Sequence, residues 1–294
     1  MSKNSRSEIL FVLLQYLLPH HLQSRLVHWV TRRRARWFNR LLMPWFIRHY
    51  GVDMTQAEEE DWRRYANFNS LFTRALKPAA RPLQAAADDQ LAVPVDGTVS
   101  QLGDIHADRI FQAKGHEYST TTLLGGDSHR ARQFENGRFA TIYLSPRDYH
   151  RIHMPLAGRL EKMVYVPGRL FSVNTITVRQ VPGVFARNER VISYFDTAAG
   201  PMALILVGAL HVGSMETVWA GTLTPPYGRY IRHWHYEDGA QAITLEKGEE
   251  MGRFNLGSTV ILLFADRAVD FDAALVPGAS TCMGQLLGRL TTRD

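Results

Sequence analysis

Length, composition and charge exclude several classes of protein. The chain has 294 residues, of which 45% are hydrophobic and 21% charged. This composition excludes a disordered, collagen-like or coiled-coil protein, and the length allows one large domain or two small ones. The single cysteine, Cys282, excludes an internal disulfide and a cysteine-based zinc site. The net charge is +6: residues 1–48, with nine basic side chains and one acidic one, carry +8, and the rest of the chain carries −2.

The N-terminal segment combines this positive charge with apolar and aromatic residues. The apolar run at 9–18 is ten residues long, too short for a bilayer span of about 20 residues. No small-residue cleavage site of a secretory signal follows it. Tryptophan, phenylalanine and leucine alternate with arginine up to residue 48. This pattern predicts amphipathic helices on an anionic membrane surface. Helices packed on the core are the alternative. The aromatic density disfavours a nucleic-acid partner.

The rest of the chain changes from helical to β-type patterns. Thr55 and Glu58 form a capping-box pattern that predicts a helix over 55–66, and 78–90 has the composition of a surface loop. Short β-type runs then recur between glycine, proline and aspartate. They lie at 91–95, 98–102, 139–144, 160–166, 191–195, 202–207, 217–220, 242–245 and 259–264. We therefore predict an α+β fold, with N-terminal amphipathic helices (1–70) followed by a mostly antiparallel β-rich catalytic domain (71–294).

Two histidines in one short segment are the first candidate for chemistry. Ser145-Pro146 predicts a short helical turn, on which His150 and His153 would share a face; in an extended chain they would oppose each other. Histidine titrates near neutrality, so the pair suits acid–base chemistry. A metal-dependent hydrolase that also uses His233 and His235 is the alternative. Motifs of nucleotide-binding proteins, zinc proteases and α/β-hydrolases are absent from the sequence.

Two further positions are unremarkable by themselves. Asp96-Gly97 is a common turn between two β-type runs. Gly257-Ser258 opens the last strongly apolar β-type run, and Gly257 could simply let the chain turn into that strand.

Several short motifs nevertheless occur in a fixed order. HRIHMP at 150–155 follows the Asp96 turn, and LGST at 256–259 lies near the C-terminus. Between them lie YVPG at 165–168, FSVN at 171–174, VWAG at 218–221 and GEEMGRF at 248–254. This ordered set, over about residues 60–265, resembles the bacterial pyruvoyl-dependent phosphatidylserine decarboxylases. The tail at 266–294 carries no motif that we recognise.

The resemblance implies a self-processing enzyme. The Ser258 hydroxyl attacks the carbonyl of Gly257, and the chain is cleaved there into a β chain (1–257) and an α chain (258–294). Ser258 becomes a covalent pyruvoyl group that forms a Schiff base with phosphatidylserine, so neither PLP nor a metal is expected. The resemblance assigns His153, oriented by Asp96, as the base that activates Ser258. His150 is the candidate proton donor during decarboxylation.

The resemblance also suggests partners and a location. Ser172 and Asn174 would line the headgroup pocket. The product would be phosphatidylethanolamine, made by a peripheral protein on the cytoplasmic side of the cell membrane. The α and β chains of one precursor stay together, and a homodimer is left open. Two alternatives remain: a non-catalytic lipid-binding module, and a soluble pyruvoyl decarboxylase of free amino acids, which the amphipathic N-terminus disfavours.

Overall fold

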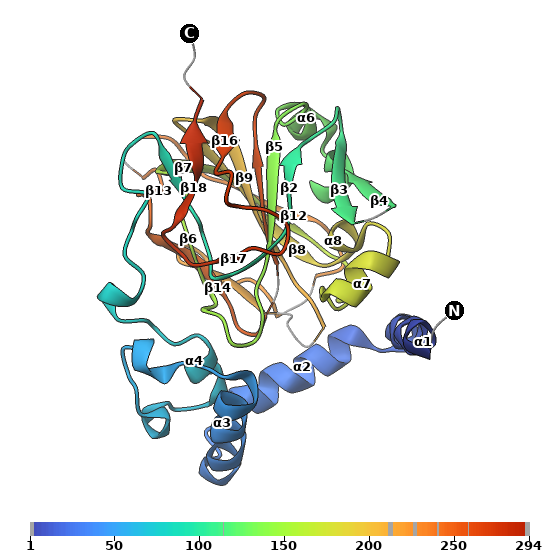
Figure 1. The fold of residues 1–294 in the computed structure, drawn as a ribbon, viewed down its shortest axis with the longest axis vertical. Helices are drawn as coiled ribbons and strands as arrows, with labels where there is room; N and C mark the ends of the chain where they lie inside the picture. Colours follow the sequence, from blue (N-terminus) through green and yellow to red (C-terminus); the bar gives the residue numbers. More distant parts are fainter. Residues whose placement is uncertain are drawn as a thin grey trace.

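Three helices form the N-terminal part of the molecule. The structure, a computed structural model, describes residues 3–113, 115–210, 214–225, 228–239, 241–257 and 259–291. The helices are α1 (Lys3–Leu17), α2 (His20–Thr31) and α3 (Arg36–Tyr50). Pro19 separates α1 from α2, and Gly51 ends α3 with a φ of 66°, a left-handed conformation that glycine adopts without strain. Figure 1 shows these helices at one end of the β-rich body, with the C-terminus at the opposite end. No helix within the described ranges is long and apolar enough to cross a bilayer.

The segment that joins these helices to the β-rich body contains only short helical turns. They are η1 (Met54–Gln56), η2 (Trp62–Arg64), α4 (Phe68–Phe72) and η3 (Pro78–Ala80). The prediction of a helix over 55–66 is wrong, because the structure has only the separate turns η1 and η2 there. The carboxylates of Asp53 and Asp61 each accept a hydrogen bond from the backbone two residues later, at 2.9 and 3.0 Å. These local hydrogen bonds stabilise two tight turns, and the backbone does not continue as one helix.

A large antiparallel sheet forms the body. Its order is β12-β7-β8-β9-β15-β5-β2-β17, with β13 also paired to β7. The strands are β12 (Arg232–His235), β7 (Gly158–Val166), β8 (Arg190–Thr197), β9 (Gly200–Val207), β15 (Thr259–Phe264), β5 (Arg138–Tyr143), β2 (Gly97–Asp104), β17 (Ser280–Thr281) and β13 (Thr244–Leu245). The pairings within it are antiparallel, so the predicted α+β class is confirmed. The boundary at residue 70 stays a prediction.

Smaller sheets and helices complete the body. One small sheet has the order β11-β10-β14-β6 and another the order β1-β18-β16, while β3 and β4 form a hairpin. Their strands are β11 (Gly221–Thr222), β10 (Met215–Thr217), β14 (Glu250–Phe254), β6 (Arg151–His153), β1 (Gln90–Ala92), β18 (Leu286–Leu290), β16 (Val269–Phe271), β3 (Arg109–Ala113) and β4 (His116–Ser119). The remaining helices are α5 (Thr120–Leu123), α6 (Ser128–Arg132), α7 (Thr175–Gln180) and α8 (Val184–Arg187).

Strand β15 lies at the centre of the large sheet and connects its two hydrophobic cores. Every residue of β15 is buried. Val260, Leu262 and Phe264 belong to one core, and Ile261 and Leu263 belong to the other. Successive side chains of a strand point to opposite faces, which explains this alternation. The Gly257-Ser258 junction therefore lies immediately before a strand that is held between β9 and β5.

Candidate active site

Gly257 lies directly beside a histidine. A Cβ built on Gly257 would lie 3.5 Å from His150 Nε2 and 3.5 Å from the Leu144 carbonyl oxygen. Thr259, at the start of β15, is buried and pairs with Tyr143 and Val207. Ser258 itself lies outside the described residues. Strand pairing thus fixes the residue after Ser258, and an imidazole lies beside the residue before it.

His150 is a buried proton acceptor. Its Nδ1–H donates to the Asp148 carbonyl oxygen at 2.8 Å, since a carbonyl oxygen can only accept. Burial lowers the pKa of His150 to about 3, so the ring is neutral and Nε2 carries a lone pair. Nε2 has no hydrogen-bond partner within the described residues. The ring packs on Phe72, with centroids 4.1 Å apart. A buried acceptor therefore faces Gly257 from an apolar environment.

His153 has a similar tautomer and different neighbours. Its Nδ1–H donates to the Gly248 carbonyl oxygen at 2.8 Å, and Nε2 accepts from the Tyr149 hydroxyl at 3.3 Å. Burial again lowers the pKa, while the charges of Glu250 and Asp96 raise it in part. His153 ends strand β6, so the chain is extended here and the two histidines do not share a helical face.

The turn predicted after Ser145 forms, although it does not become a helix. The Asp148 N–H donates to the Ser145 carbonyl oxygen at 3.0 Å, and the Asp148 carboxylate accepts from the Ser145 N–H at 2.7 Å. These reciprocal bonds close a single turn and leave the chain extended from Arg151 onward.

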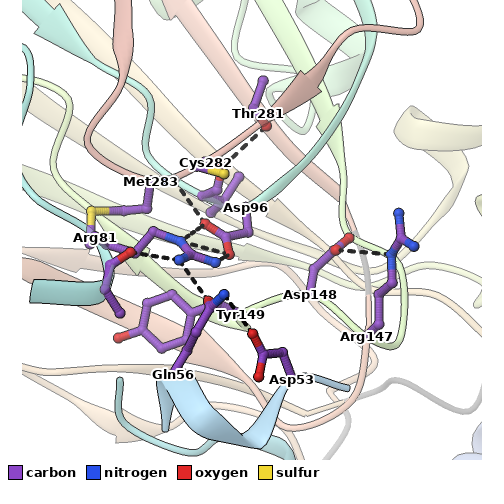
Figure 2. Close-up of polar contacts among 12 residues, drawn as sticks. Asp53, Gln56, Arg81, Asp96, Arg147, Asp148, Tyr149, Thr281, Cys282 and Met283 are labelled. Atoms are coloured by element: carbon purple, nitrogen blue, oxygen red, sulfur yellow. Dashed lines mark hydrogen bonds and ion pairs between the residues drawn. The ribbon is translucent and has the colours of Figure 1, made fainter. Parts of the chain in front are cut away.

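Asp96 is paired with an arginine that the sequence analysis missed. Arg81 Nε donates to both carboxylate oxygens of Asp96, at 2.8 and 3.0 Å, and the Met283 N–H donates to Oδ1 at 2.8 Å. Figure 2 shows Arg81 lying between Asp96 and Gln56, to which it also donates at 2.8 Å. No hydrogen bond joins Asp96 to His153 among the described residues. Arg81 follows a proline-containing loop without any motif, so no signal in the sequence points to it.

An apolar cavity opens beside Gly257. Its volume is about 390 Å³, within the usual range for small-molecule sites. One wall comes from the N-terminal part of the chain, including Trp45, Phe46 and Phe72, and another includes Ser172 and Asn174. The Ser172 N–H donates to Gln15 Oε1 at 2.8 Å, whereas Asn174 Oδ1 caps α7 by accepting from the Thr177 N–H at 3.0 Å. Both candidate pocket residues therefore lie in the wall of the cavity that contains Gly257.

The histidine pairs are separated in the fold. His233 and His235 lie exposed on β12, at the edge of the large sheet, whereas His153 lies in β6 of another sheet. Within the described parts of the chain, no group of three histidine, cysteine, aspartate or glutamate residues could hold a metal ion. The predicted four-histidine metal arrangement is therefore not assembled by these residues.

The site as a whole fits a pyruvoyl group formed from Ser258. The unpartnered Nε2 of His150 supplies a proton acceptor beside Gly257, and the open apolar cavity that Gly257 lines supplies space for a ligand.

Comparison with known proteins identifies the family. A family model described as phosphatidylserine decarboxylase matches residues 68–289, and a second, described as PSD, matches residues 10–51. The chain is 55% identical over 281 residues to the phosphatidylserine decarboxylase proenzyme of Shewanella denitrificans, covering 95% of this chain and 97% of the relative. The proenzyme of Shewanella loihica is 54% identical, with coverages of 95% and 98%. The chain belongs to the phosphatidylserine decarboxylase family, as its motifs indicated.

Proposed function

We propose that this protein is a proenzyme that matures by cleavage between Gly257 and Ser258 and then converts phosphatidylserine to phosphatidylethanolamine at a membrane surface. The observation that carries the proposal is the buried, unpartnered His150 Nε2 beside Gly257, a residue that itself lines an apolar cavity. The curated relatives are named proenzymes, which agrees with maturation by cleavage.

The maturation step needs only the chain's own groups and one water molecule. The Ser258 hydroxyl oxygen attacks the carbonyl carbon of Gly257, and the peptide C–N bond breaks to leave an ester. Elimination then removes the Cα proton of residue 258 and breaks the bond between this oxygen and Cβ, which frees the carboxylate of Gly257 and leaves dehydroalanine. The dehydroalanine tautomerises to an imine, and water hydrolyses the imine to the pyruvoyl ketone and ammonia. Glycine at 257 suits the attack because it allows backbone conformations that a Cβ hinders. A serine hydroxyl is a weak nucleophile and needs a base.

We assign that base to His153, with Asp96 as the acidic partner, following the family resemblance. In support, the carboxylate of Asp96 is close enough to His153 for its charge to raise the imidazole pKa. His153 Nε2 carries a lone pair in the neutral ring, as a base requires.

His150 then serves the substrate. A pyruvoyl group formed from Ser258 would supply the electron-accepting carbonyl that decarboxylation needs. The substrate carbon that loses CO₂ must then be protonated, and His150, whose Nε2 lies beside Gly257, is the candidate group for that transfer.

The helices α1–α3 supply the proposed contact with the membrane. They carry large exposed apolar side chains, including Leu10, Trp37 and Leu41, which are 58, 72 and 69% exposed. Apolar rings beside arginine suit an interfacial position on an anionic leaflet, which favours a peripheral protein on the cytoplasmic side.

The test separates maturation from turnover. The purified protein should run as fragments 1–257 and 258–294 under denaturing conditions, and the smaller fragment should lack a free amine in its intact mass. Ser258→Ala should stay as one chain. CO₂ release should occur with phosphatidylserine vesicles and be absent with free serine. A single uncut wild-type chain would contradict the proposal, and activity on free serine would favour the soluble alternative.

A further inference from the structure

A second cavity lies between the start of α3, the linker that precedes it, and η2 with the residues that follow it, and is lined by arginines. Its volume is about 910 Å³. Five of its lining residues are arginines and none is acidic. We call it the arginine pocket; it comprises Arg34, Arg36, Arg40, Arg63 and Arg64. It shares no lining residue with the cavity beside Gly257.

Three of these arginines have no counter-charge. Arg63 and Arg64 pair with Asp61 and Glu59, at 3.3 and 3.2 Å, on the exposed surface. Among the described residues no ion pair involves the other three, Arg34, Arg36 and Arg40. Within the part of the chain that the structure describes, no carboxylate pairs with these three arginines, so the pocket carries a net positive charge that suits an anion.

The backbone around the pocket is held by a buried amide. Asn39 is 7% exposed, and its Nδ2 donates to the Arg33 carbonyl oxygen at 3.2 Å. This bond ties the linker before α3 to α3 itself and so brings Arg34 close to the α3 arginines. Arg36 and Arg40 are four residues apart and share one face of the helix. Asn39 Oδ1 has no hydrogen-bond partner within the described residues.

An apolar ridge runs beside the arginines on the same helix. Trp37 and Leu41 each follow a pocket arginine by one residue and are among the most exposed apolar side chains of the described chain. Neighbouring positions on a helix differ by about 100°, so the ridge adjoins the arginine row. A ligand for this surface has an anionic head and an apolar tail. Arginine binds phosphate oxygens in a bidentate geometry, which makes phosphate the preferred anion.

We propose that the arginine pocket binds the phosphate of an anionic phospholipid that is not the substrate, and that this contact anchors the helices on the membrane. The inference rests on the proposed membrane function and adds to it a discrete lipid site, separate from the active site. A soluble phosphate or a nucleic acid would use the arginines and leave the apolar ridge without a role.

The test compares two pairs of substitutions with equal charge loss in the full-length protein. Arg36→Gln/Arg40→Gln changes the pocket. Arg33→Gln/Arg48→Gln changes neighbouring exposed arginines that do not line it. Binding is measured by sedimentation with phosphatidylcholine vesicles that contain phosphatidylglycerol. We expect the pocket pair to bind about tenfold more weakly than the control pair, because it loses bidentate phosphate contacts as well as charge. Equal losses for the two pairs would show a diffuse attraction and overturn the proposal.

Three further measurements show whether the variants fold normally, whether the bound phosphate belongs to a lipid, and whether the pocket is separate from the active site. Circular dichroism and thermal unfolding should be the same for both pairs. Glycerol phosphate or a short RNA should fail to displace the protein from vesicles at equal phosphate concentration; displacement by either would overturn the lipid assignment. Decarboxylation in detergent micelles should be unchanged in both pairs. If the pocket pair loses it, the pocket belongs to the active site. If the wild type lacks it too, the proposed function fails while the binding comparison still decides the pocket.

Discussion

The surroundings of His150 and His153 differ more than their spacing of three residues suggests. Both rings donate Nδ1–H to a backbone carbonyl and carry a lone pair on Nε2. His150 Nε2 faces Gly257 in an apolar region beside Phe72. His153 Nε2 faces the hydroxyl of Tyr149. Two histidines in the same tautomer therefore direct their Nε2 lone pairs at different groups.

The difference lies in the charged network behind each ring. The charge that acts on His150 is that of Arg74, whereas Glu250, Arg151 and Asp96 all act on His153. Asp96 also accepts from the Met283 N–H, so it contacts the segment after the cleavage site. His150 is thus placed beside Gly257, at the junction itself. His153 belongs to a network that joins the chain before the junction to the chain after it.

The largest expected effects come from removing each histidine. His153→Ala and Asp96→Asn should slow self-cleavage by about 10²–10⁴-fold, the usual contribution of a positioned base. His150→Ala should cleave and then release CO₂ about 10²–10⁴-fold more slowly, because its proton transfer follows maturation. Gel analysis and CO₂ release on the same variants check both.

The position of His150 Nε2 beside Gly257 also supports the opposite assignment, in which His150 is the base for self-cleavage. If His150→Ala stays uncut, with a wild-type circular dichroism spectrum, while His153→Ala cleaves, His150 is the base and the two roles are exchanged.

The second comparison concerns the ion pair between Arg81 and Asp96, whose carboxylate acts on His153. Arg81→Met should lower the free energy of unfolding by about 3–5 kcal/mol, because it leaves Asp96 buried and unpaired. The side chains of the pair are 17 and 7% exposed. Denaturant unfolding measures the loss in the uncleavable Ser258→Ala background.

A double variant separates stability from chemistry. Arg81→Met/Asp96→Asn should recover much of the stability, since no charge is left buried, and it should remain uncut. Normal cleavage by this double variant would show that Asp96 has only a structural role.

The burial of His150 predicts a pH dependence of stability. Its pKa is about 3 in the folded protein and 6.5 as an unperturbed group. The unfolded chain therefore binds more protons between these values, and the free energy of unfolding falls as pH drops below 6.5. In the Ser258→Ala background, His150→Ala should lessen this fall by about 1.4 kcal/mol per pH unit. His129→Ala, on the exposed surface of α6, is the control; an equal change in both would contradict the prediction.

The smallest expected effect comes from Tyr149. Tyr149→Phe removes the hydroxyl that donates to His153 Nε2 at 3.3 Å. A neutral hydrogen bond contributes about 0.5–1.5 kcal/mol, so self-cleavage should change by about two- to tenfold, and decarboxylation by the matured protein should not. A time course of cleavage checks the first, and CO₂ release per cleaved chain checks the second. A larger loss of decarboxylation than of cleavage would place Tyr149 with His150.

The sequence by itself determined the elements whose signals are local. The apolar β-type run at 259–264 became β15 with the same bounds, because continuous apolar residues after a glycine suit a strand buried on both faces. The order of the motifs identified the family, since each motif is short and their succession is specific. The predicted helix at 55–66 failed where two aspartates closed tight turns instead.

Only the tertiary structure decided which groups meet. Asp96 contacts Arg81, 15 residues away, and Met283, 187 residues away, and neither contact follows from any sequence period. His150 lies beside Gly257, whereas His153, three residues later at the end of β6, faces Tyr149, because an extended chain turns residues three apart to opposite sides. The cavity exists because α2 and α3 pack over Leu256 and Gly257. Sequence patterns report the environment of each residue along its own element, whereas the partner of a side chain depends on how distant elements pack.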